Sequence, residues 1–345
     1  MPPIPLPGSA MDSPLVSVTG LVAEFKTEAG RIRALNGIDF AIPRGRTLAV
    51  LGESGCGKSV TAQCLLNLVR HPGSITAGQI VYYGSGTGVD IARLNPASEA
   101  MRRLRGPEIA MIFQEPMTSF DPLFSVGEQI TEMLHAHDRT LTRAAARAHA
   151  IEMLRRVRLP SPELIVDRYP HQLSGGMRQR VMIALALSCG PKLLIADEPT
   201  TALDVTTESQ ILDLLRNLQA ELGMSIMFIT HDLGVASEMA DEVIVMYLGY
   251  VVEQGPADQV LTAPQHPYTR ALLESVPKID AAPGARLNAI RGMVPTPDQM
   301  PTGCPFHTRC DAFIPGRCDR VLPDLWPAGE GRFSRCHLAA PGGAA

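Results

Sequence analysis

The stretch that decides the fold is residues 48–59, which read LAVLGESGCGKS. The four apolar residues at its start predict a buried strand, and residues 59–69 predict the helix that follows. Between them, the spacing G-x-x-x-x-G-K-S predicts a loop whose backbone N–H groups surround phosphate oxygens at the positive end of that helix. In this pattern Lys58 reaches the β and γ phosphates, and the Ser59 hydroxyl binds Mg²⁺. The candidate residues of this phosphate loop are Gly52, Glu53, Ser54, Gly55, Cys56, Gly57, Lys58 and Ser59.

A second apolar run, Leu193–Ala196, ends in two adjacent acids, Asp197 and Glu198. Two carboxylates at the end of a buried strand are costly unless a cation or a proton-transfer task holds them. We expect Asp197 to serve the metal ion and Glu198 to serve the water that attacks the phosphate. An ordinary exit from strand to turn is the alternative interpretation of this pair.

The organisation of the chain is that of an α/β protein. From Leu15 to about Leu261, short apolar runs alternate with helical stretches, which predicts a core sheet that is largely parallel. Polar residues follow the strand predicted at Ser225–Ile229, at the edge where ligands of such sheets bind. Helical composition such as that of Thr142–Val157 predicts a helical subdomain inserted at about residues 98–180. The expected domains are a disordered lead-in at 1–13, a main domain at 14–262 and a C-terminal region at 263–345.

Composition excludes several classes of function. The chain has 345 residues and a net charge of −4, with 31 basic and 35 acidic residues, and it carries no basic block that would predict binding to nucleic acid. Its longest apolar runs, Val181–Cys189 and Val243–Leu248, fall short of the roughly 18 residues that a membrane-spanning helix needs. We therefore expect a protein that is soluble or that sits on an embedded partner.

The segment Leu173–Met177, LSGGM, resembles the signature motif of ABC transporter ATPases, and further motifs of that family occur in the same order. The resemblance implies a P-loop ABC ATPase fold with a mostly parallel core, an antiparallel β part, the inserted helical subdomain and a small Cys-rich C-terminal region. It also implies ATP and Mg²⁺ as cofactors. The residues that match the family are Gln114 of the Q-loop, Asp204 of the D-loop, the switch histidine His231, the signature residues Ser174, Gly175 and Gly176, and Phe25 as the adenine-stacking aromatic. The resemblance implies that Gln114 senses Mg²⁺ and the attacking water, and so belongs to the Mg²⁺ site with Ser59 and Asp197. For Phe25, a place in a buried strand is the alternative.

In this family the signature of one subunit closes over the nucleotide held by another. By that resemblance Ser174–Gly176 serve a partner's ATP, and Glu198 and His231 complete an active site that hydrolyses ATP. A soluble ABC ATPase that acts on ribosomes or DNA would instead show two ATPase domains, a long coiled-coil insert or a basic face. A regulatory module without turnover would lack Glu198 or His231.

Two other stretches resemble the oligopeptide/dipeptide branch of importers, Met117–Pro122 and His266–Leu273. The resemblance implies a peripheral ATPase on the cytoplasmic face of the membrane, coupled to the transport of peptides. The partners that it implies are two transmembrane permease subunits, a second ABC ATPase subunit and an extracytoplasmic peptide-binding protein. For the second ATPase subunit a paralogue is favoured, and a second copy of this chain is the alternative. Nickel, glutathione or another small solute is the alternative cargo.

Four cysteines lie near the C-terminus, with five, seven and seventeen residues between them: Cys304, Cys310, Cys318 and Cys336. Some members of the branch that this tail resembles carry a [4Fe–4S] cluster, and four thiolates suffice for one. Zinc is the alternative, with His307 or His337 as a substitute ligand. Four reduced thiols without a metal are the third interpretation. A cluster would act as a structural staple, because a segment rich in Pro and Gly buries little apolar surface.

Overall fold

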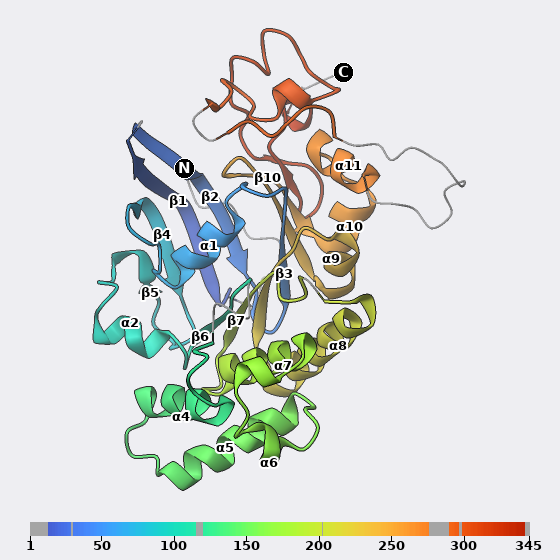
Figure 1. Ribbon diagram of the computed structural model, residues 1–345. Helices are drawn as coiled ribbons and strands as arrows, with labels where there is room; N and C mark the ends of the chain where they lie inside the picture. Colours follow the sequence, from blue (N-terminus) through green and yellow to red (C-terminus); the bar gives the residue numbers. More distant parts are fainter. Residues whose placement is uncertain are drawn as a thin grey trace. The chain divides into compact units, whose positions relative to one another are not determined.

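The computed structural model describes residues 13–28, 30–114, 120–201, 203–275, 290–296 and 299–341 (Figure 1). The chain divides into two compact units. Unit 1 contains the described residues of Met1–Tyr83, Gly88–Arg93 and Thr230–Ala345, and unit 2 those of Gly84–Thr87 and Leu94–Ile229. The predicted lead-in at 1–13 lies outside the described residues, except for Ser13.

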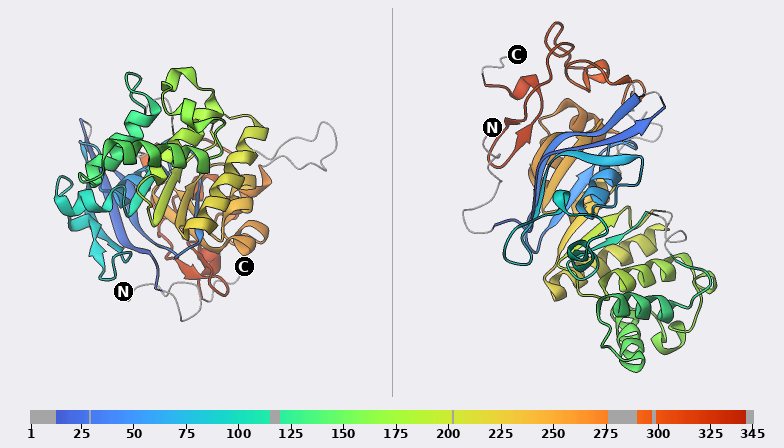
Figure 2. Two further views of the ribbon diagram at one scale, coloured as in Figure 1. Left: turned by 90° about the horizontal axis from the view of Figure 1, so that it is seen from below. Right: turned by 90° about the vertical axis from the view of Figure 1, so that its left-hand side faces the viewer.

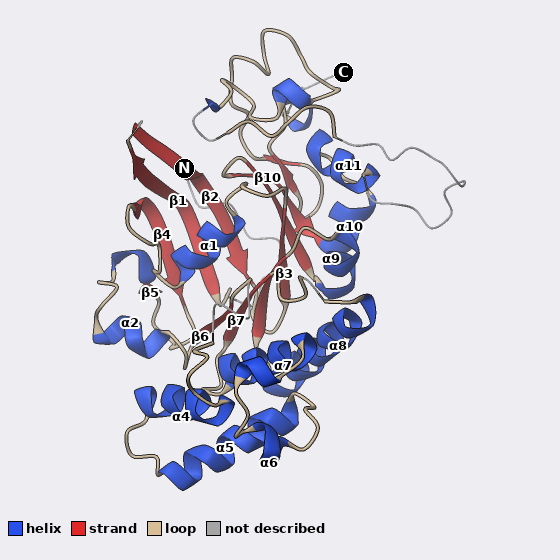
Figure 3. Ribbon diagram, viewed as in Figure 1, coloured by secondary structure: helices blue, strands red, loops and turns tan. Residues whose placement is uncertain are grey.

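Unit 1 contains the antiparallel sheet that the family resemblance predicts. Its strands are β1 (Val16–Thr27), β2 (Gly30–Ile42), β4 (Gly73–Tyr82) and β5 (Val89–Asp90), in the order β2-β1-β4-β5 (Figure 3). Val16 and Ile42, which pair across β1 and β2, are both fully buried. The apolar residues of one face of this sheet therefore contribute to the core of unit 1.

A second group of strands in unit 1 leads into the phosphate loop. Strand β3 (Thr47–Leu51) is buried at every residue and pairs in parallel with β9 (Glu242–Tyr247). Strand β9 pairs antiparallel with β10 (Tyr250–Pro256), and β10 with β12 (Phe333–Ser334), which in turn pairs with β11 (Trp326–Pro327). The helical segments of unit 1 are α1 (Lys58–Leu65), η1 (Ile91–Arg93), α9 (Leu233–Met239), α10 (Ala257–Thr262), α11 (Pro267–Glu274), η4 (His307–Arg309) and η5 (His337–Ala339).

Helix α1 is shorter than the helix predicted for residues 59–69. It ends at Leu65, because Asn67 adopts a left-handed backbone with φ of 48° and its side chain donates to the carbonyl of Ile91. Asn tolerates that conformation better than most residues, and a residue in it commonly ends a helix. The helix starts at Lys58, one residue before the predicted start.

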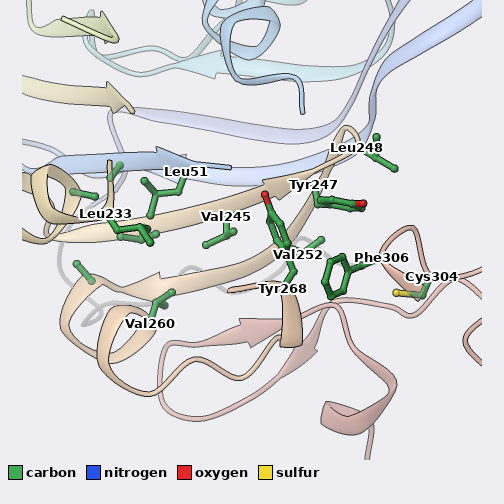
Figure 4. Close-up of a cluster of buried hydrophobic side chains, with 14 of the residues drawn as sticks. Leu51, Leu233, Val245, Tyr247, Leu248, Val252, Val260, Tyr268, Cys304 and Phe306 are labelled. Carbon is green, nitrogen blue, oxygen red and sulfur yellow. The ribbon is translucent and has the colours of Figure 1, made fainter. Parts of the chain in front are cut away.

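The C-terminal region shares the apolar core of unit 1. Tyr268 of α11 and Phe306 lie with their ring centroids 5.2 Å apart, and Phe306 packs edge-on against Tyr247 of β9 at 5.3 Å (Figure 4). Cys304 and Cys318 are buried in the same cluster. Side chains from the predicted C-terminal region at 263–345 therefore share an apolar core with strand β9, a contact that the sequence does not predict. The aromatic side chains of this region are too widely spaced in the sequence to give a periodic signal.

Unit 2 combines three parallel strands with a group of helices. Strand β7 (Leu193–Asp197) pairs with β6 (Ile109–Ile112) on one side and β8 (Ser225–Ile229) on the other, which confirms the predicted parallel pairing. The helical segments are α2 (Glu99–Leu104), α4 (Val126–His137), α5 (Arg143–Arg156), α6 (Pro162–Ile165), η2 (Pro170–Gln172), α7 (Gly175–Leu187) and α8 (Val205–Leu222). Helices α4, α5, α6 and α7 pack together (green in Figure 2). The predicted helical subdomain at 98–180 is not entirely helical, because β6 lies within it.

Helix ends in unit 2 follow capping residues that the sequence displays. The side chain of Thr142 accepts a hydrogen bond from Ala145 N and starts α5, so the observed helix coincides with the one predicted for Thr142–Val157. Ser125 and Glu128 form a capping box at the start of α4. In the part of the chain that the structure describes, no helix is both long and apolar enough to cross a bilayer.

Candidate functional site

The phosphate loop of unit 1 requires glycine at two positions because other chain segments approach it closely. Gly52 has φ of 146°, and a Cβ placed on it would lie 2.3 Å from the carbonyl oxygen of Met246. Gly57 has φ of 104°, and a Cβ there would lie 2.8 Å from the carbonyl oxygen of Ala34. Gly57 also caps α1 without a side chain, so backbone N–H groups at the helix start can receive an anion.

Lys58, the first residue of α1, points back over the loop. Its ammonium donates to the carbonyl oxygens of Gly52 at 2.7 Å and Glu53 at 3.1 Å, and the residue is only 6% exposed. A buried ammonium held by neutral carbonyls is well placed to bind phosphate oxygens, which carry the charge that carbonyls lack. Ser59 follows it, half-buried, in the first turn of the same helix.

His231 lies in unit 1, in the short connection before α9. The preceding residue, Thr230, donates its backbone N–H to the carbonyl of Val50 in β3 at 3.3 Å, and Asp232 caps α9. The Thr230 hydroxyl accepts the backbone N–H of Asp232 at 2.9 Å. These bonds fix the backbone on both sides of His231 beside the strand that enters the phosphate loop. The side chain of His231 itself is exposed.

Phe25 lies on β1 and is half-buried. Its ring packs on Gly73, where an added Cβ would lie 2.5 Å from Phe25 Cε1. Strands β1 and β4 pair at this point, Phe25 opposite Gly73. The structure thus places Phe25 in the antiparallel sheet, and its role in stacking adenine stays a prediction.

In unit 2 the structure brings together two residues that lie 84 positions apart in the sequence. The side-chain amide of Gln114 donates to Glu198 Oε2 at 3.0 Å, and the hydroxyl of Thr201 donates to the same oxygen at 3.0 Å. Glu198 has a left-handed backbone with φ of 48°, and its N–H donates to the carbonyl of Ile229 in β8. A non-glycine residue in that region is strained, and such strain gathers at functional sites.

Asp197 ends β7, directly before that strained residue. It pairs with Ile229 and is 4% exposed. A carboxylate buried to this extent at the end of an apolar strand suits a Mg²⁺ site that also uses phosphate oxygens, because Mg²⁺ is commonly bound through one or two carboxylates and substrate phosphates. Residues 115–119 of the Q-loop stretch and Ala202 of the D-loop lie outside the described residues.

The signature segment and the D-loop also lie together within unit 2. Ser174 caps α7 by accepting the N–H of Met177 at 3.3 Å. Gly176 approaches Thr207 so closely that an added Cβ would lie 2.7 Å from the methyl carbon of that residue. Thr207 in turn donates its N–H and its hydroxyl to Asp204, the cap of α8, and these bonds lower the pKa of that carboxyl. Asp204 therefore orders the helix start on which the signature glycine packs.

The four C-terminal thiols are free, and all except Cys310 are buried. Burial, with a smaller contribution from the neighbouring thiols, raises the pKa of Cys304 to about 12 and that of Cys310 to about 11. His307 and His337, the alternative ligands, hydrogen-bond the backbone carbonyls of Cys304 and Val321. Among the described residues, no group of three or more His, Cys, Asp or Glu side chains is arranged to hold a metal ion.

Three residues at the site were not predicted from the sequence. Thr201 supports Glu198, while Tyr268 and Arg309 both bond to Glu53 of the phosphate loop. Tyr268 and Arg309 lie in stretches that resemble the importer branch, so the sequence marks the segments but assigns these side chains no role.

Comparison with known proteins agrees with these motifs. The sequence profile of the family described as ABC transporter matches residues 35–201, and that described as Oligopeptide/dipeptide transporter, C-terminal region, matches residues 252–318. The oligopeptide transport ATP-binding protein AppD of Bacillus subtilis is 48% identical over 332 residues, which cover 96% of this chain and 99% of AppD. A peptide import ATP-binding protein of Brucella ovis is 48% identical over 330 residues, which cover 94% of this chain and 96% of the Brucella protein.

Solved structures show the same fold. The ATP-binding cassette MJ0796, a dimer in a post-hydrolysis state bound to ADP and Pi, matches with a TM-score of 0.62 and 28% identity over 70% of this chain and 98% of its own. The protein cbiO1 of Clostridium perfringens, part of the ABC transporter complex cbiONQ, matches with a TM-score of 0.60 and 30% identity over 73% of this chain and 92% of its own. The chain therefore belongs to the ABC transporter ATPases, in the branch that carries the oligopeptide/dipeptide transporter C-terminal region.

Proposed function

We propose that this chain is the ATP-hydrolysing subunit that energises a peptide importer in the membrane. The observation that carries the proposal is the full-length similarity to AppD, which includes the C-terminal region as well as the nucleotide-binding part. The cassettes of known structure cover only about 70% of the chain and support ATP hydrolysis without indicating a cargo. The cargo assignment therefore depends on the peptide-transport relatives.

The proposed chemistry assigns each motif a step. Lys58 and the N–H groups of the phosphate loop bind the β and γ phosphates, and Glu198 takes the proton of the attacking water. Gln114 and Thr201 donate to one carboxylate oxygen of Glu198 and so orient the carboxylate for its role as the base. Ser59, Gln114 and Asp197 would hold Mg²⁺, which would neutralise charge that develops on the transferred phosphate.

The described residues of unit 2 contain a groove that suits a docking permease segment. Its volume is about 620 Å³, and both acidic and basic side chains line it, among them Glu128, Glu132 and Arg147. Phe124, which immediately precedes one of the lining residues, is 46% exposed. We propose that cytoplasmic segments of two permease subunits bind here and in a second ATPase subunit, which places this chain on the cytoplasmic face of the membrane.

The second ATPase subunit is proposed from the signature segment. In the described structure Ser174 and Gly176 order a helix start, a geometry that binds anions. The dimeric state of the similar cassette MJ0796 supports pairing of two such chains. We propose that the second subunit is a paralogue, so that the two ATPase subunits form a heterodimer. We also propose that an extracytoplasmic peptide-binding protein delivers peptide to the permease subunits.

We also propose that the four C-terminal thiols hold a [4Fe–4S] cluster. Ile314 N donates to Cys318 Sγ at 3.4 Å, and backbone groups of Phe306, Ala312 and Leu338 lower the pKa values of Cys304, Cys310 and Cys336 against the larger effect of burial. Backbone donors near the sulfurs suit thiolates that share the negative charge of a cluster. The cluster would staple the C-terminal region.

Anaerobic purification tests the cluster proposal. Visible absorption with about four iron and four sulfide per chain supports it. One zinc ion per chain without iron would establish zinc as the bound metal. A protein with neither metal would support the third interpretation, four reduced thiols.

The transport function is tested by purification of the native chain from detergent-solubilised membranes. We expect two permease subunits and a second ATPase to co-purify, and ATPase activity to rise when peptide-loaded binding protein is added. A complex that recovers permeases but responds to nickel or glutathione instead would change the cargo. A chain that recovers no permease and ignores every binding protein would exclude the importer function.

A further inference from the structure

Two side chains of the C-terminal part of unit 1 hold Glu53, the second residue of the phosphate loop. Arg309 forms two parallel hydrogen bonds to the Glu53 carboxylate, at 2.7 Å from Nη1 to Oε2 and 3.0 Å from Nη2 to Oε1. The backbone N–H of Glu53 donates to the hydroxyl of Tyr268 at 2.9 Å. Both the backbone and the side chain of one loop residue are therefore fixed by residues more than 200 positions away.

The arginine is itself tightly held. Its side chain is 4% exposed, and that of Glu53 is 25% exposed, so the pair is largely shielded from water. Arg309 Nε donates to the carbonyl of Arg291 at 3.0 Å, and Nη1 also donates to the hydroxyl of Tyr247 at 3.3 Å. A planar guanidinium with this many fixed bonds gives a bidentate pair of defined geometry.

Tyr268 is positioned by the apolar core. It is fully buried, and its ring centroid lies 4.7 Å from that of Tyr247 and 5.2 Å from that of Phe306. Its hydroxyl is the polar end of an otherwise apolar side chain, and buried tyrosine hydroxyls usually need a partner. The N–H of Glu53 provides that partner, so the position of the loop depends on how the C-terminal region packs.

The charge of Glu53 gives this arrangement a consequence for ligand binding. A carboxylate on a loop that binds a polyphosphate repels the ligand, and in a largely shielded site that repulsion is stronger than in water. Arg309 neutralises the carboxylate and also draws it away by a bidentate bond. Without Arg309, an unpaired negative charge would remain on the phosphate loop.

We propose that Arg309 and Tyr268 are positioning residues for nucleotide binding, and that through them the C-terminal region sets the affinity of the phosphate loop for ATP. We call Glu53, Arg309 and Tyr268 the C-terminal clamp. The inference depends on ATP binding at this loop and not on which solute is transported. The turn η4, which carries Arg309, is bounded by Cys304 and Cys310, so the clamp also gives the cysteine cluster a physical route to the phosphate loop.

The test compares the nucleotide affinities of full-length variants by calorimetric titration with ATP, ADP and AMP. Arg309→Met should weaken ATP binding about 10-fold, ADP binding less and AMP binding least, because the unpaired carboxylate repels ligands in proportion to their charge. Adding Glu53→Gln to Arg309→Met removes that charge and should recover most of the lost affinity. Tyr268→Phe, which removes the hydroxyl that accepts the Glu53 N–H and adds no charge, should weaken ATP binding by a few fold.

The matched control is Arg332→Met. Arg332 is also buried, belongs to the same region and pairs with a buried acid, Glu253, which does not contact the loop in any described bond. This control should lower the unfolding temperature and leave ATP affinity at the wild-type value.

Two results would overturn the proposal. The first is that Arg309→Met loses the same affinity for ATP, ADP and AMP, and no more than the control loses. The second is that the double variant, Glu53→Gln with Arg309→Met, binds ATP as weakly as Arg309→Met alone. Arg309→Lys serves if Arg309→Met does not fold. Lysine keeps the positive charge but cannot form the two parallel bonds to Glu53. A loss of ATP affinity that is smaller than the 10-fold loss expected for Arg309→Met therefore supports the clamp. An ATP affinity equal to that of the wild type contradicts it.

Discussion

The residue that shows most clearly how this sequence builds a catalytic site is Glu198. The strand before it predicts where the carboxylate lies, and the family resemblance predicts that it acts as the base. The strained φ of 48° and the bond from Gln114 could not be predicted, because both depend on segments that meet only in the fold. Strain is tolerated here since the Ile229 carbonyl and two side-chain donors fix the residue.

Replacing Glu198 by Gln tests its role at this scale. Glutamine keeps an oxygen that can accept from Gln114 and Thr201 but cannot take a proton, so ATP turnover should fall about 100-fold or more while ATP binding remains. Single-turnover assays and nucleotide titration separate the two effects. Turnover at the wild-type rate would show that another group is the base.

His266 predicts a specific dependence of stability on pH. It is buried, its Nδ1 accepts the N–H of Tyr268, and burial lowers its pKa from about 6.5 to about 3. The unfolded chain therefore binds a proton between these values that the folded chain does not, so stability decreases as the pH falls through this window. Between pH 6.5 and pH 5, this group should lower the free energy of unfolding by about 2 kcal/mol.

The variant His266→Asn provides the check, because asparagine can cap α11 with its side-chain oxygen but does not titrate. Urea unfolding of both proteins between pH 7 and pH 5 should show a shallower decrease in stability for the variant. Equal pH dependence in the two proteins would mean that His266 is not the responsible group.

At the scale of elements, the strands around the site were more predictable than the helix ends. The apolar runs at β3, β7 and β8 are short and fully buried, so composition alone identifies them. Strand β6 was missed because its four residues lie between helices, where a short apolar run is also typical of a buried helix. Helix α1 was predicted too long because one left-handed residue, Asn67, leaves little signal in its neighbours.

A buried ion pair lies where β12 pairs with β10, because Glu253 of β10 is opposite Ser334 of β12 and contacts Arg332. Glu253 is 1% exposed and accepts the N–H groups of Gln265 and His266, besides its contact with Arg332. Arg332→Met leaves that charge without its cation, so the free energy of unfolding should fall by about 3 kcal/mol. Denaturant unfolding measures the change, and a difference below about 0.5 kcal/mol would show that the pair does not stabilise the region.

At the scale of the whole molecule, the sequence predicted the ATPase motifs and the cysteine-rich tail but not the contacts between them. The ATPase motifs and the cysteine-rich tail were each recognised from local patterns. The bond between Arg309 and Glu53 joins positions 256 residues apart, and no local pattern in a single sequence predicts which distant charges meet. The same holds for Tyr268 and Phe306, whose shared core makes the C-terminal region part of unit 1.

Together with the proposed [4Fe–4S] cluster, this connection predicts that loss of the cluster alters nucleotide binding. Chelation of iron from anaerobically purified protein should free the turn that carries Arg309 and weaken ATP binding by a few fold. The double variant Glu53→Gln with Arg309→Met lacks the clamp and should show no such change. Equal weakening in both proteins would show that the cluster acts on ATP binding by another route.

The most direct test of the transport function is peptide uptake by the complex, reconstituted in vesicles with its permease subunits, binding protein and second ATPase. With ATP on the side of the ATPase subunits, the wild-type chain should drive peptide accumulation, and the complex that contains Glu198→Gln should accumulate little peptide while still binding ATP. Peptide uptake that needs no ATP, or that continues at the wild-type rate with Glu198→Gln, would contradict the assignment of this chain as the ATPase that powers import.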